Sequence, residues 1–294
     1  MTGENSFAAL LRDRLEIQID RIEPLEGGMI GTVARVHGTD GTCVVAKTGP
    51  TPLETEAFML GHLADESDLP VPSVEYADRE LLVLEDLPGT TDHGHGVARD
   101  AARHLGALHD VTGRAHGFPR DTVTGPVHQP NPWTDSWRSF FRKRRLEHAA
   151  QLALEEPSPI EESSETGALP PSLYERLRTI ATDTDVLLEE PPAPSLIHGD
   201  VWRTNVLSED GRVTGFLDPA SYYADPEIEL AYVDWTDTFG EAFFQTYESL
   251  RGIREGFFET RRYVYRLYPL LVHVHLFGED YLAELERTCA KLGY

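Results

Sequence analysis

Three side chains that carry oxygen stand at fixed offsets in the segment 195–220, namely Asp200, Asn205 and Asp218. Moving a phosphoryl group from ATP to a hydroxyl needs a carboxylate beside that hydroxyl, Mg²⁺ on the phosphates and oxygen ligands for the metal. A polar loop with an aspartate and an asparagine, followed by an aspartate at the end of an apolar run, supplies these groups. The pattern therefore predicts a phosphotransfer centre.

The letters around these residues narrow the prediction. His198-Gly199-Asp200 and Asn205 keep the spacing of a kinase catalytic loop, and Asp218-Pro219-Ala220 stands where kinases carry D-F-G. Each of these pieces alone is ordinary turn chemistry. Because several offsets coincide, we favour a catalytic loop.

Upstream elements are expected to position the phosphates. The strand pattern C-V-V-A-K ends on Lys47, one of only three lysines, and apolar spacing over 53–63 predicts a helix. A glutamate on that helix would pair with Lys47 and hold its ammonium at the phosphates. We rank Glu56 ahead of Glu54, and the alternative is that both carboxylates face solvent.

A glycine pair and an apolar strand complete the expected nucleotide site. Gly27 and Gly28 lie between strand-like runs over 17–25 and 30–37, where backbone N–H groups can approach phosphate oxygens. Paired glycines are also common in hairpins. The strand at 80–87 ends in Glu85, Asp86 and Leu87, which we expect to form a hinge that meets adenine through its backbone.

Length and pattern predict two lobes, 1–87 and 88–294, with strands concentrated in the first and helices in the second. The only strongly basic patch, 129–146, could steer an anionic or sugar-bearing substrate, or be a solvated face. Asp225 and Glu229 are expected to brace the catalytic loop through its backbone or His198, unless they are surface carboxylates at a helix start. Paired histidines such as His273 and His275 lack the cysteines or convergent carboxylates of a zinc site.

Composition limits the partners. The net charge is −24, so nucleic acid and anionic membranes are excluded as expected partners. Many carboxylates with few lysines are also typical of salt-adapted proteins, and at about 1 M salt their repulsion is largely screened. Cys43 and Cys289 indicate neither disulfides nor zinc, and no signal peptide or membrane span is recognisable, so we expect a cytoplasmic protein.

The chain resembles the fructosamine (ketosamine) kinases, a branch of the aminoglycoside phosphotransferase group with a protein-kinase-like fold. The motifs that carry the resemblance span most of the chain: the double-glycine loop, C-V-V-A-K at 43–47, L-V-L-E at 82–85, L-G-A-L-H at 105–109, Q-P-N-P-W at 129–133, H-G-D-V-W-x-x-N at 198–205 and D-P-A-S-Y-Y-A-D at 218–225. The resemblance implies a bilobal α+β fold. Its smaller lobe would be an antiparallel sheet with one main helix, and its larger lobe would be mostly helical.

The resemblance also implies roles. Asp200 would be the catalytic base, Asn205 and Asp218 the Mg²⁺ ligands, and Lys47 with Glu56 the pair that positions the phosphates. Trp202 would line the sugar site.

The implied reaction uses ATP to phosphorylate a sugar hydroxyl, the 3-hydroxyl in this family, on ketoamine adducts of amines or protein lysines. The product then breaks down and frees the amine, which is a repair activity. Family members usually carry Ser-Gly where this chain has Arg203-Thr204, so the substrate can differ. Alternatives are a choline, homoserine or aminoglycoside kinase of the same fold, or a nucleotide-binding pseudokinase. The oligomeric state is left open.

Overall fold

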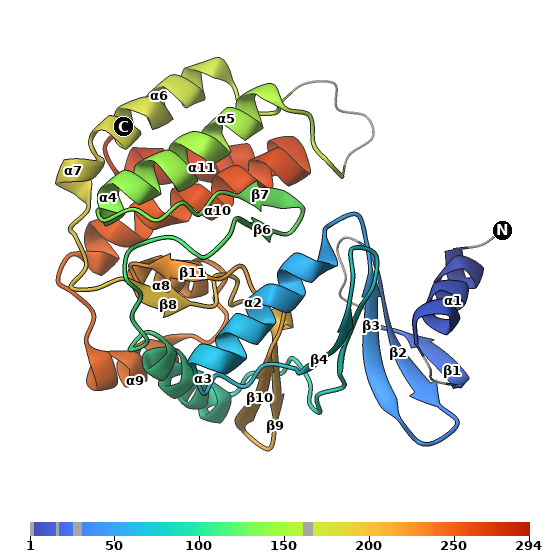
Figure 1. Cartoon of the computed structure of the whole chain (residues 1–294). Coiled ribbons are helices and arrows are strands. Elements are labelled where there is room, and N and C mark those ends of the chain that lie inside the picture. Colours follow the sequence, from blue (N-terminus) through green and yellow to red (C-terminus); the bar gives the residue numbers. More distant parts are fainter. Residues whose placement is uncertain (1–2, 16–17, 26–30, 161–166) are drawn as a thin grey trace.

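In the computed structural model of the chain, a five-stranded antiparallel sheet and a larger, mostly helical region lie on either side of one helix, α2 (Figure 1). The structure describes residues 3–15, 18–25, 31–160 and 167–294. The sheet has the order β1-β2-β3-β5-β4. The elements of this first region are α1 (Gly3–Arg14), β1 (Ile19–Pro24), β2 (Thr32–Gly38), β3 (Cys43–Thr48), α2 (Leu53–Glu66), β4 (Val74–Ala77) and β5 (Leu82–Glu85).

Strand β3 shows how the sheet is covered on both faces. Successive side chains of a strand point to opposite faces. Val44 and Ala46 are buried in a cluster with Phe7 and Leu11 of α1, so this face packs against the N-terminal helix. Lys47 belongs to the opposite face, which is the one that α2 covers. The alternation in the sequence therefore places the lysine between the sheet and α2.

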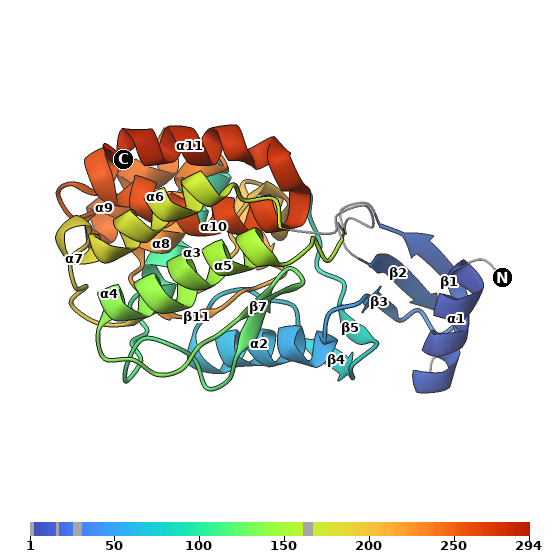
Figure 2. The same cartoon turned by 90° about the horizontal axis from the view of Figure 1, so that it is seen from above.

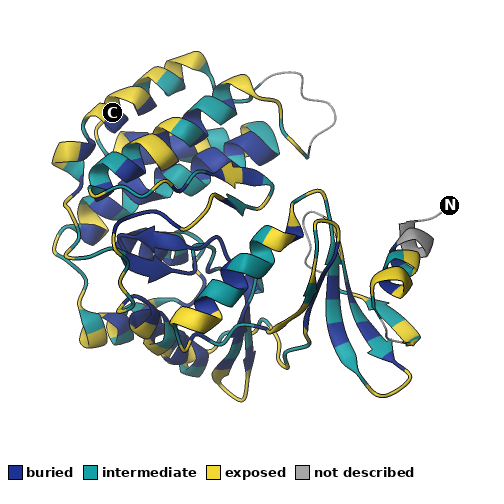
Figure 3. Cartoon of the chain, viewed as in Figure 1, coloured by how far each residue is buried: buried dark blue, intermediate teal, exposed yellow. Residues whose placement is uncertain are grey.

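Helix α2 packs against both regions. Its Leu53 and Leu60 are buried with Leu82 and Leu84 of the sheet. Met59 and Leu63, on another face of the same helix, belong to the main core of the helical region. The buried residues of that core fill the interior on the helical side of the molecule (Figure 3). Position and tilt of α2 are therefore set by both cores.

The helical region begins after β5. Its elements are α3 (His95–Leu108), β6 (Thr122–Thr124), β7 (Val127–Gln129), α4 (Trp137–Phe140), the π-helical η1 (Phe141–Leu146), α5 (Glu147–Glu155), α6 (Pro171–Thr182), α7 (Thr184–Leu187), β8 (Ser195–Ile197), η2 (Arg203–Asn205), β9 (Val206–Glu209), β10 (Arg212–Phe216), β11 (Tyr222–Ala224), α8 (Glu227–Trp235), α9 (Glu241–Arg251), η3 (Phe257–Arg261), α10 (Arg262–Phe277), η4 (Gly278–Tyr281) and α11 (Leu282–Lys291). Seen from above, α5, α6, α10 and α11 lie beside one another in the helical region (Figure 2). No helix in the described ranges is long and apolar enough to cross a membrane.

Two small antiparallel pairs hold the predicted catalytic segment. Strand β8 pairs with β11, and β9 pairs with β10, so the loop 198–205 is anchored at both ends. A Cβ atom added to Gly215 of β10 would lie 2.3 Å from the Leu87 side chain, so the segment after β5 packs directly on this hairpin. The connection between the two regions is thus fixed close to the catalytic loop.

The basic stretch at 129–146 is interior through its aromatic residues and one arginine. Trp137, Phe140 and Phe141 are fully buried, and the buried Arg145 guanidinium lies 3.9 Å from the centre of the Tyr222 ring. Only part of its basic groups faces solvent, Lys143 among them. Arg138 pairs with Glu190 and Arg142 with Glu147, so these cations balance neighbouring carboxylates as the second interpretation expects. Steering of a substrate by the exposed cations stays a prediction.

Candidate active site

Backbone geometry holds the catalytic loop in place. Gly199 has a φ of +88°, and a Cβ atom there would lie 2.3 Å from the Ala220 carbonyl oxygen. Only glycine fits such a position without strain. The Ala220 N–H in turn donates to the His198 carbonyl at 2.9 Å, so the H-G-D and D-P-A segments are clamped together. This clamp brings the loop of Asp200 next to Asp218.

Asp200 and Asn205 form a direct pair. The Asn205 side-chain amide donates to the Asp200 carboxylate at 2.9 Å and to the Asp200 carbonyl at 3.0 Å. Burial raises the pKa of Asp200 to about 7, although the hydrogen bond from Tyr232 acts in the opposite direction. Since Asn205 uses its nitrogen here, its amide oxygen remains for a cation. Asp200 is thus poised to exchange a proton near neutral pH.

Lys47 lies between two carboxylates. Its ammonium is 2.7 Å from Glu56 on α2 and also forms an ion pair with Asp218. Burial alone would lower the pKa of Lys47, but Asp218 and Glu56 raise it above its ordinary value, so the ammonium stays charged. The expected pairing with Glu56 is confirmed, and the competing Glu54 is exposed.

Asp218 has an unusual backbone. Its φ is +55°, a conformation that costs energy in residues other than glycine and is concentrated at functional sites. Burial would raise the pKa of this carboxyl, but Lys47 holds it below its usual range. Its side chain is nevertheless 47% exposed, so it remains accessible to solvent. An ionised, accessible carboxylate of this kind can ligate a metal ion.

Glu229 of α8 braces the catalytic loop, as expected. Its buried carboxylate accepts the Gly199 N–H at 2.6 Å and the His198 N–H at 3.4 Å. It also accepts from His109 Nε2 at 2.8 Å, and His109 Nδ1 lies 2.7 Å from the Tyr247 hydroxyl. Burial would raise the pKa of Glu229, but the bond from His109 holds it below its usual range.

His198 stands inside the loop that it was expected to support. It is fully buried, and burial lowers its pKa, so the ring is neutral. Its Nδ1 accepts the Asp200 N–H at 3.3 Å. The neutral ring thus helps to set the backbone of the residue that carries the carboxylate.

Asp225 does not have the role that we expected. It forms an ion pair with Arg254, accepts the Tyr265 hydroxyl at 2.7 Å and accepts the Glu227 N–H at 3.0 Å. These contacts tie the start of α8 to the C-terminal helices. The expectation that Asp225 braces the catalytic loop is therefore wrong, because its carboxylate is taken by Arg254 and Tyr265.

The expected hinge residues use their side chains locally. Glu85 accepts from the Ser73 hydroxyl at 3.0 Å, and Asp86 accepts from Arg35 at 2.7 Å. Leu87 packs near Gly215 of the catalytic hairpin. A contact of this segment's backbone with adenine remains a prediction. Gly27 and Gly28 lie outside the described residues.

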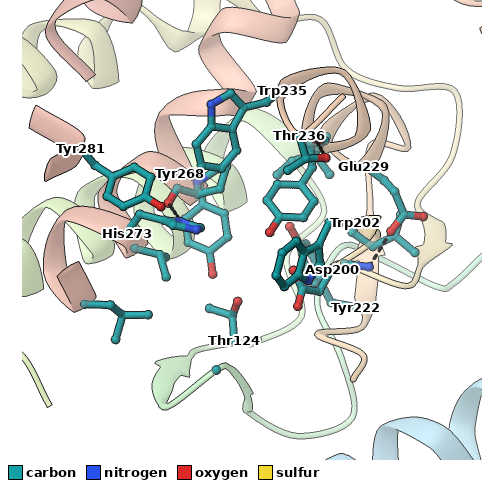
Figure 4. A pocket seen from close by; sticks show the side chains of 18 of the residues that line it. Thr124, Asp200, Trp202, Tyr222, Glu229, Trp235, Thr236, Tyr268, His273 and Tyr281 are labelled. Carbon is teal, nitrogen blue, oxygen red and sulfur yellow. Dashed lines mark hydrogen bonds between the residues drawn. The ribbon is translucent and has the colours of Figure 1, made fainter. Parts of the chain in front are cut away.

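A cavity of about 520 Å³ opens beside Asp200 (Figure 4). Trp202 lines the cavity, and its expected place at a sugar site stays a prediction. Arg203 does not line it: this residue is exposed, and its guanidinium reaches the Thr91 carbonyl at 3.5 Å. The cavity is lined by Thr124, Gly125, Ile197, Gly199, Asp200, Trp202, Tyr222, Ile228, Glu229, Tyr232, Trp235, Thr236, Tyr268, Pro269, Val272, His273, Leu276, Phe277 and Tyr281. A mostly aromatic and apolar wall with one poised carboxylate is typical of a small-molecule site.

Most of this wall escaped the sequence analysis. Tyr232 and Trp235 come from α8, and His273 comes from α10, segments that carry only a general helical pattern. In the sequence around α8 only the carboxylates Asp225 and Glu229 stand out, and nothing in the spacing predicts that Tyr232 shares a cavity with Asp200. The loop of Asp200 and Asn205 is local in sequence, whereas the wall of the cavity is assembled from distant helices.

An Asp–Asn catalytic loop, a Lys–Glu pair and an exposed second aspartate, placed between a five-stranded sheet and a helical region, define a phosphotransferase of the kinase-like class. The sequence model of the fructosamine kinase family matches residues 5–293. The chain therefore belongs to the fructosamine kinase family, and it is a phosphotransferase that, as a kinase, uses ATP.

Individual relatives agree with this membership. A Synechocystis sp. protein named as a ketoamine kinase is 34% identical over 242 residues, covering 80% of this chain and 76% of the relative. The chloroplastic protein-ribulosamine 3-kinase of Arabidopsis thaliana is 28% identical over 286 residues, covering 92% of this chain and 82% of the relative.

Solved structures confirm the fold. A crystal structure named as a fructosamine-3-kinase of Thermobifida fusca superposes with a TM-score of 0.83 at 25% identity, covering 98% of both chains. An aminoglycoside phosphotransferase, APH(4)-Ia, in a ternary complex with AMP-PNP and hygromycin B, gives a TM-score of 0.64 at 16% identity over 97% of this chain and 96% of its own. The expected bilobal, kinase-like α+β fold is thus confirmed.

Proposed function

We propose that this protein transfers the γ-phosphoryl group of ATP to a sugar hydroxyl of a ketosamine, the 3-hydroxyl of a fructosamine or ribulosamine adduct. The single observation that carries the proposal is the Asp200 carboxylate, which the Asn205 amide holds at 2.9 Å and which lines the aromatic cavity. The relatives named as ketoamine and ribulosamine kinases support this choice of acceptor. Breakdown of the phosphorylated adduct would free the amine, so the activity would reverse glycation.

Asp200 is the proposed acceptor of the hydroxyl proton. Its carboxylate is oriented by the Asn205 amide at 2.9 Å, and Tyr232 lines the same cavity. A base with a pKa near 7 is partly ionised at neutral pH and still basic enough to take a proton in the transition state. Trp202 and Tyr222 lie on the same wall and would hold the sugar against the carboxylate.

The donor set beside Asp200 fits Mg²⁺. The Asn205 amide oxygen and the Asp218 carboxylate can both donate oxygen to a metal ion. In the described ranges, no group of three or more His, Cys, Asp or Glu is arranged to hold a metal, so these residues are not part of a complete protein cage. Mg²⁺ with phosphates commonly takes only one or two protein oxygens. When bound, it would neutralise the charge on the phosphates.

Lys47 would bind the phosphates from the opposite side. Glu56 holds its ammonium at 2.7 Å, and the second contact, to Asp218, is one that a bound nucleotide would compete with. The side chain of Asp218 would then be released toward the metal. Lys47 would thus supply the positive charge that binds the ATP phosphates. Glu56 would hold the Lys47 ammonium in position, and Asp218 would bind the metal.

The test is ATP consumption by the purified protein with Mg²⁺ in high salt. The acceptors are fructosyl-, ribulosyl- and erythrulosyl-lysine, with an aminoglycoside, choline and homoserine as controls. We expect turnover on a ketosamine and at least about a hundredfold loss in Asp200→Ala, because a positioned base contributes roughly 10² to 10⁴ in rate. ATP affinity should be kept in that variant, since Asp200 serves the acceptor.

Other results would redirect the assignment. Turnover confined to choline, homoserine or an aminoglycoside would keep the chemistry and replace the acceptor. Nucleotide binding without turnover on any acceptor would favour a pseudokinase. Wild-type turnover in Asp200→Ala would refute the assignment of the base.

A further inference from the structure

The cavity has a second end, away from Asp200, that is made of aromatic rings. Trp235 and His273 meet edge to face, with ring centres 5.0 Å apart and planes at 88°. His273 and Tyr281 are 4.7 Å apart, and Trp235 and Tyr281 are 6.4 Å apart at 69°. Figure 4 shows these three residues at the side of the cavity opposite Asp200. The three rings contact one another and line the cavity together, and we call this cluster the box.

Hydrogen bonds hold the box in this shape. The indole nitrogen of Trp235 donates to Glu284 at 2.7 Å, which fixes the ring and places a carboxylate behind it. His273 Nδ1 lies 2.7 Å from the Pro269 carbonyl oxygen, and because a carbonyl only accepts, this nitrogen carries the proton. Burial lowers the pKa of His273, so the ring is neutral near pH 7 and its Nε2 is an acceptor.

Charge at this end of the cavity favours a cation. None of the described lining residues is a lysine or an arginine, whereas Glu284 stands behind Trp235 and the whole chain carries a net charge of −24. A carboxylate or phosphate on the acceptor would meet no cationic partner among those lining groups. Aromatic faces, in contrast, attract ammonium groups, most strongly when both are shielded from water.

We propose that Trp235, His273 and Tyr281 bind the protonated amine of the acceptor while the sugar lies against Asp200. The inference rests on the proposed function, since a ketosamine joins a sugar to a secondary ammonium. It adds a substrate class: amine adducts that bring a positive charge and no carboxylate close to the sugar. The box would thus act as a specificity element that the catalytic motifs do not contain.

The competing explanation is a purely apolar box that accepts any hydrocarbon or sugar face. The two explanations differ in how the site treats a charged nitrogen and a neutral oxygen of the same shape. Fructosyl-propylamine and its ether isostere, 1-O-propylfructose, present this pair with the same sugar. We therefore compare kcat/KM on the two acceptors at about pH 7 and moderate salt.

For the wild type we expect kcat/KM to be about tenfold higher for the amine than for the ether, which corresponds to about 1.4 kcal/mol. The difference should lie mainly in KM, because the box binds the acceptor and does not touch the transferred group. Tyr281→Leu removes a ring face while keeping apolar volume, so the ratio should fall toward about one. Tyr281→Phe keeps the face and should keep the preference.

Phe258→Leu is the matched control, since Phe258 is an exposed aromatic outside the cavity. Its ratio should equal that of the wild type, and thermal unfolding of every variant verifies folding. Equal kcat/KM for amine and ether in the wild type would overturn the proposal. The same ratio in Tyr281→Leu as in wild type would also overturn it.

A binding measurement separates this inference from the proposed function. Tetramethylammonium is titrated into the protein while tryptophan fluorescence is followed. If the wild type phosphorylates neither fructosyl-propylamine nor 1-O-propylfructose, the proposed function fails. The titration then tests cation binding by the box on its own. Saturable binding that Tyr281→Leu abolishes would support it, and absence of binding to the wild type would refute it.

Discussion

Replacing Asp200 by asparagine should remove activity and at the same time make the protein more stable above neutral pH. The pKa of Asp200 is raised by burial from 3.8 to about 7 in the folded chain. The unfolded chain therefore loses this proton near pH 4, and the folded chain near pH 7. Between these pH values the folded chain holds a proton that the unfolded chain has already released, so the free energy of unfolding falls as pH rises. Above about pH 7 both states have lost the proton, and the destabilisation due to Asp200 is constant.

The size of the effect follows from the shift. About 3 pH units at about 1.4 kcal/mol each set an upper bound of about 4 kcal/mol. Asp200 faces an open cavity, so screening by water reduces the cost to about 2 kcal/mol. Asparagine carries no charge but has only one acceptor oxygen for Asn205 and Tyr232, and the lost hydrogen bond costs about 1 kcal/mol. The variant should thus be about 1 kcal/mol more stable than wild type at about pH 8.

Urea unfolding at about pH 5.5 and 8, in constant salt with chelator and no nucleotide, measures this effect. The lower limit stays above the isoelectric point of about 4.8. The advantage of Asp200→Asn should shrink by about 1 kcal/mol or more between the two conditions, because wild-type Asp200 regains its proton. Asp237→Asn, at an exposed aspartate, should show no such change. If the stability difference between Asp200→Asn and wild type is the same at both pH values, the pKa of Asp200 is not raised. If the turnover of Asp200→Asn is within about tenfold of wild type, Asp200 is not the catalytic base.

Four further outcomes follow from the site. Lys47→Met should lower kcat/KM for ATP by at least about a hundredfold, which steady-state kinetics measures. It should also lower the thermal unfolding temperature, because Glu56 and Asp218 then face each other without a cation. Unchanged ATP kinetics would contradict the role assigned to Lys47. Glu229→Gln should lower the free energy of unfolding in urea by about 1–3 kcal/mol and also lower kcat, because the catalytic loop loses an ionised hydrogen-bond acceptor. If stability falls while kcat is unchanged, Glu229 does not act on catalysis. The pH profile of kcat/KM should fall about tenfold per unit below about pH 7 as Asp200 takes up a proton, and a flat profile down to about pH 5 would argue against it. Raising KCl from about 0.1 to about 2 M should raise the urea midpoint, because the net charge is −24, and full stability at low salt would count against a salt-adapted protein.

The catalytic loop was predictable because its parts are close in sequence. Asp200, Asn205 and Asp218 lie within one short stretch, and the two strand pairs around it have local apolar signals. Lys47 was also predictable, since strand alternation puts it opposite the face that α1 covers. Motifs of this kind can be recognised from the spacing of their residues, because the local backbone alone brings those residues together.

Choices between neighbouring carboxylates needed the tertiary structure. Glu54 and Glu56 both stand in the first turn of α2, and only the packing of that helix between two cores turns Glu56 to Lys47. Asp225 and Glu229 likewise lie on either side of the start of α8, yet only Glu229 reaches the Gly199 N–H, while Asp225 pairs with Arg254. A sequence states the type of a side chain but not which of several partners its element will face.

The sequence by itself determined the class of chemistry and the pairing of Lys47 with a glutamate of the helix over 53–63, because these depend on short-range spacing and periodicity. Only the tertiary structure decided the cavity beside Asp200, since Tyr232, Trp235, His273 and Tyr281 come from helices and turns whose contacts lie far apart along the chain. Burial and a neighbouring hydroxyl, which set the pKa of Asp200, are likewise properties of the folded packing. Helical periodicity indicates which residues are buried, whereas the rings that meet across a cavity are selected by how the helices cross.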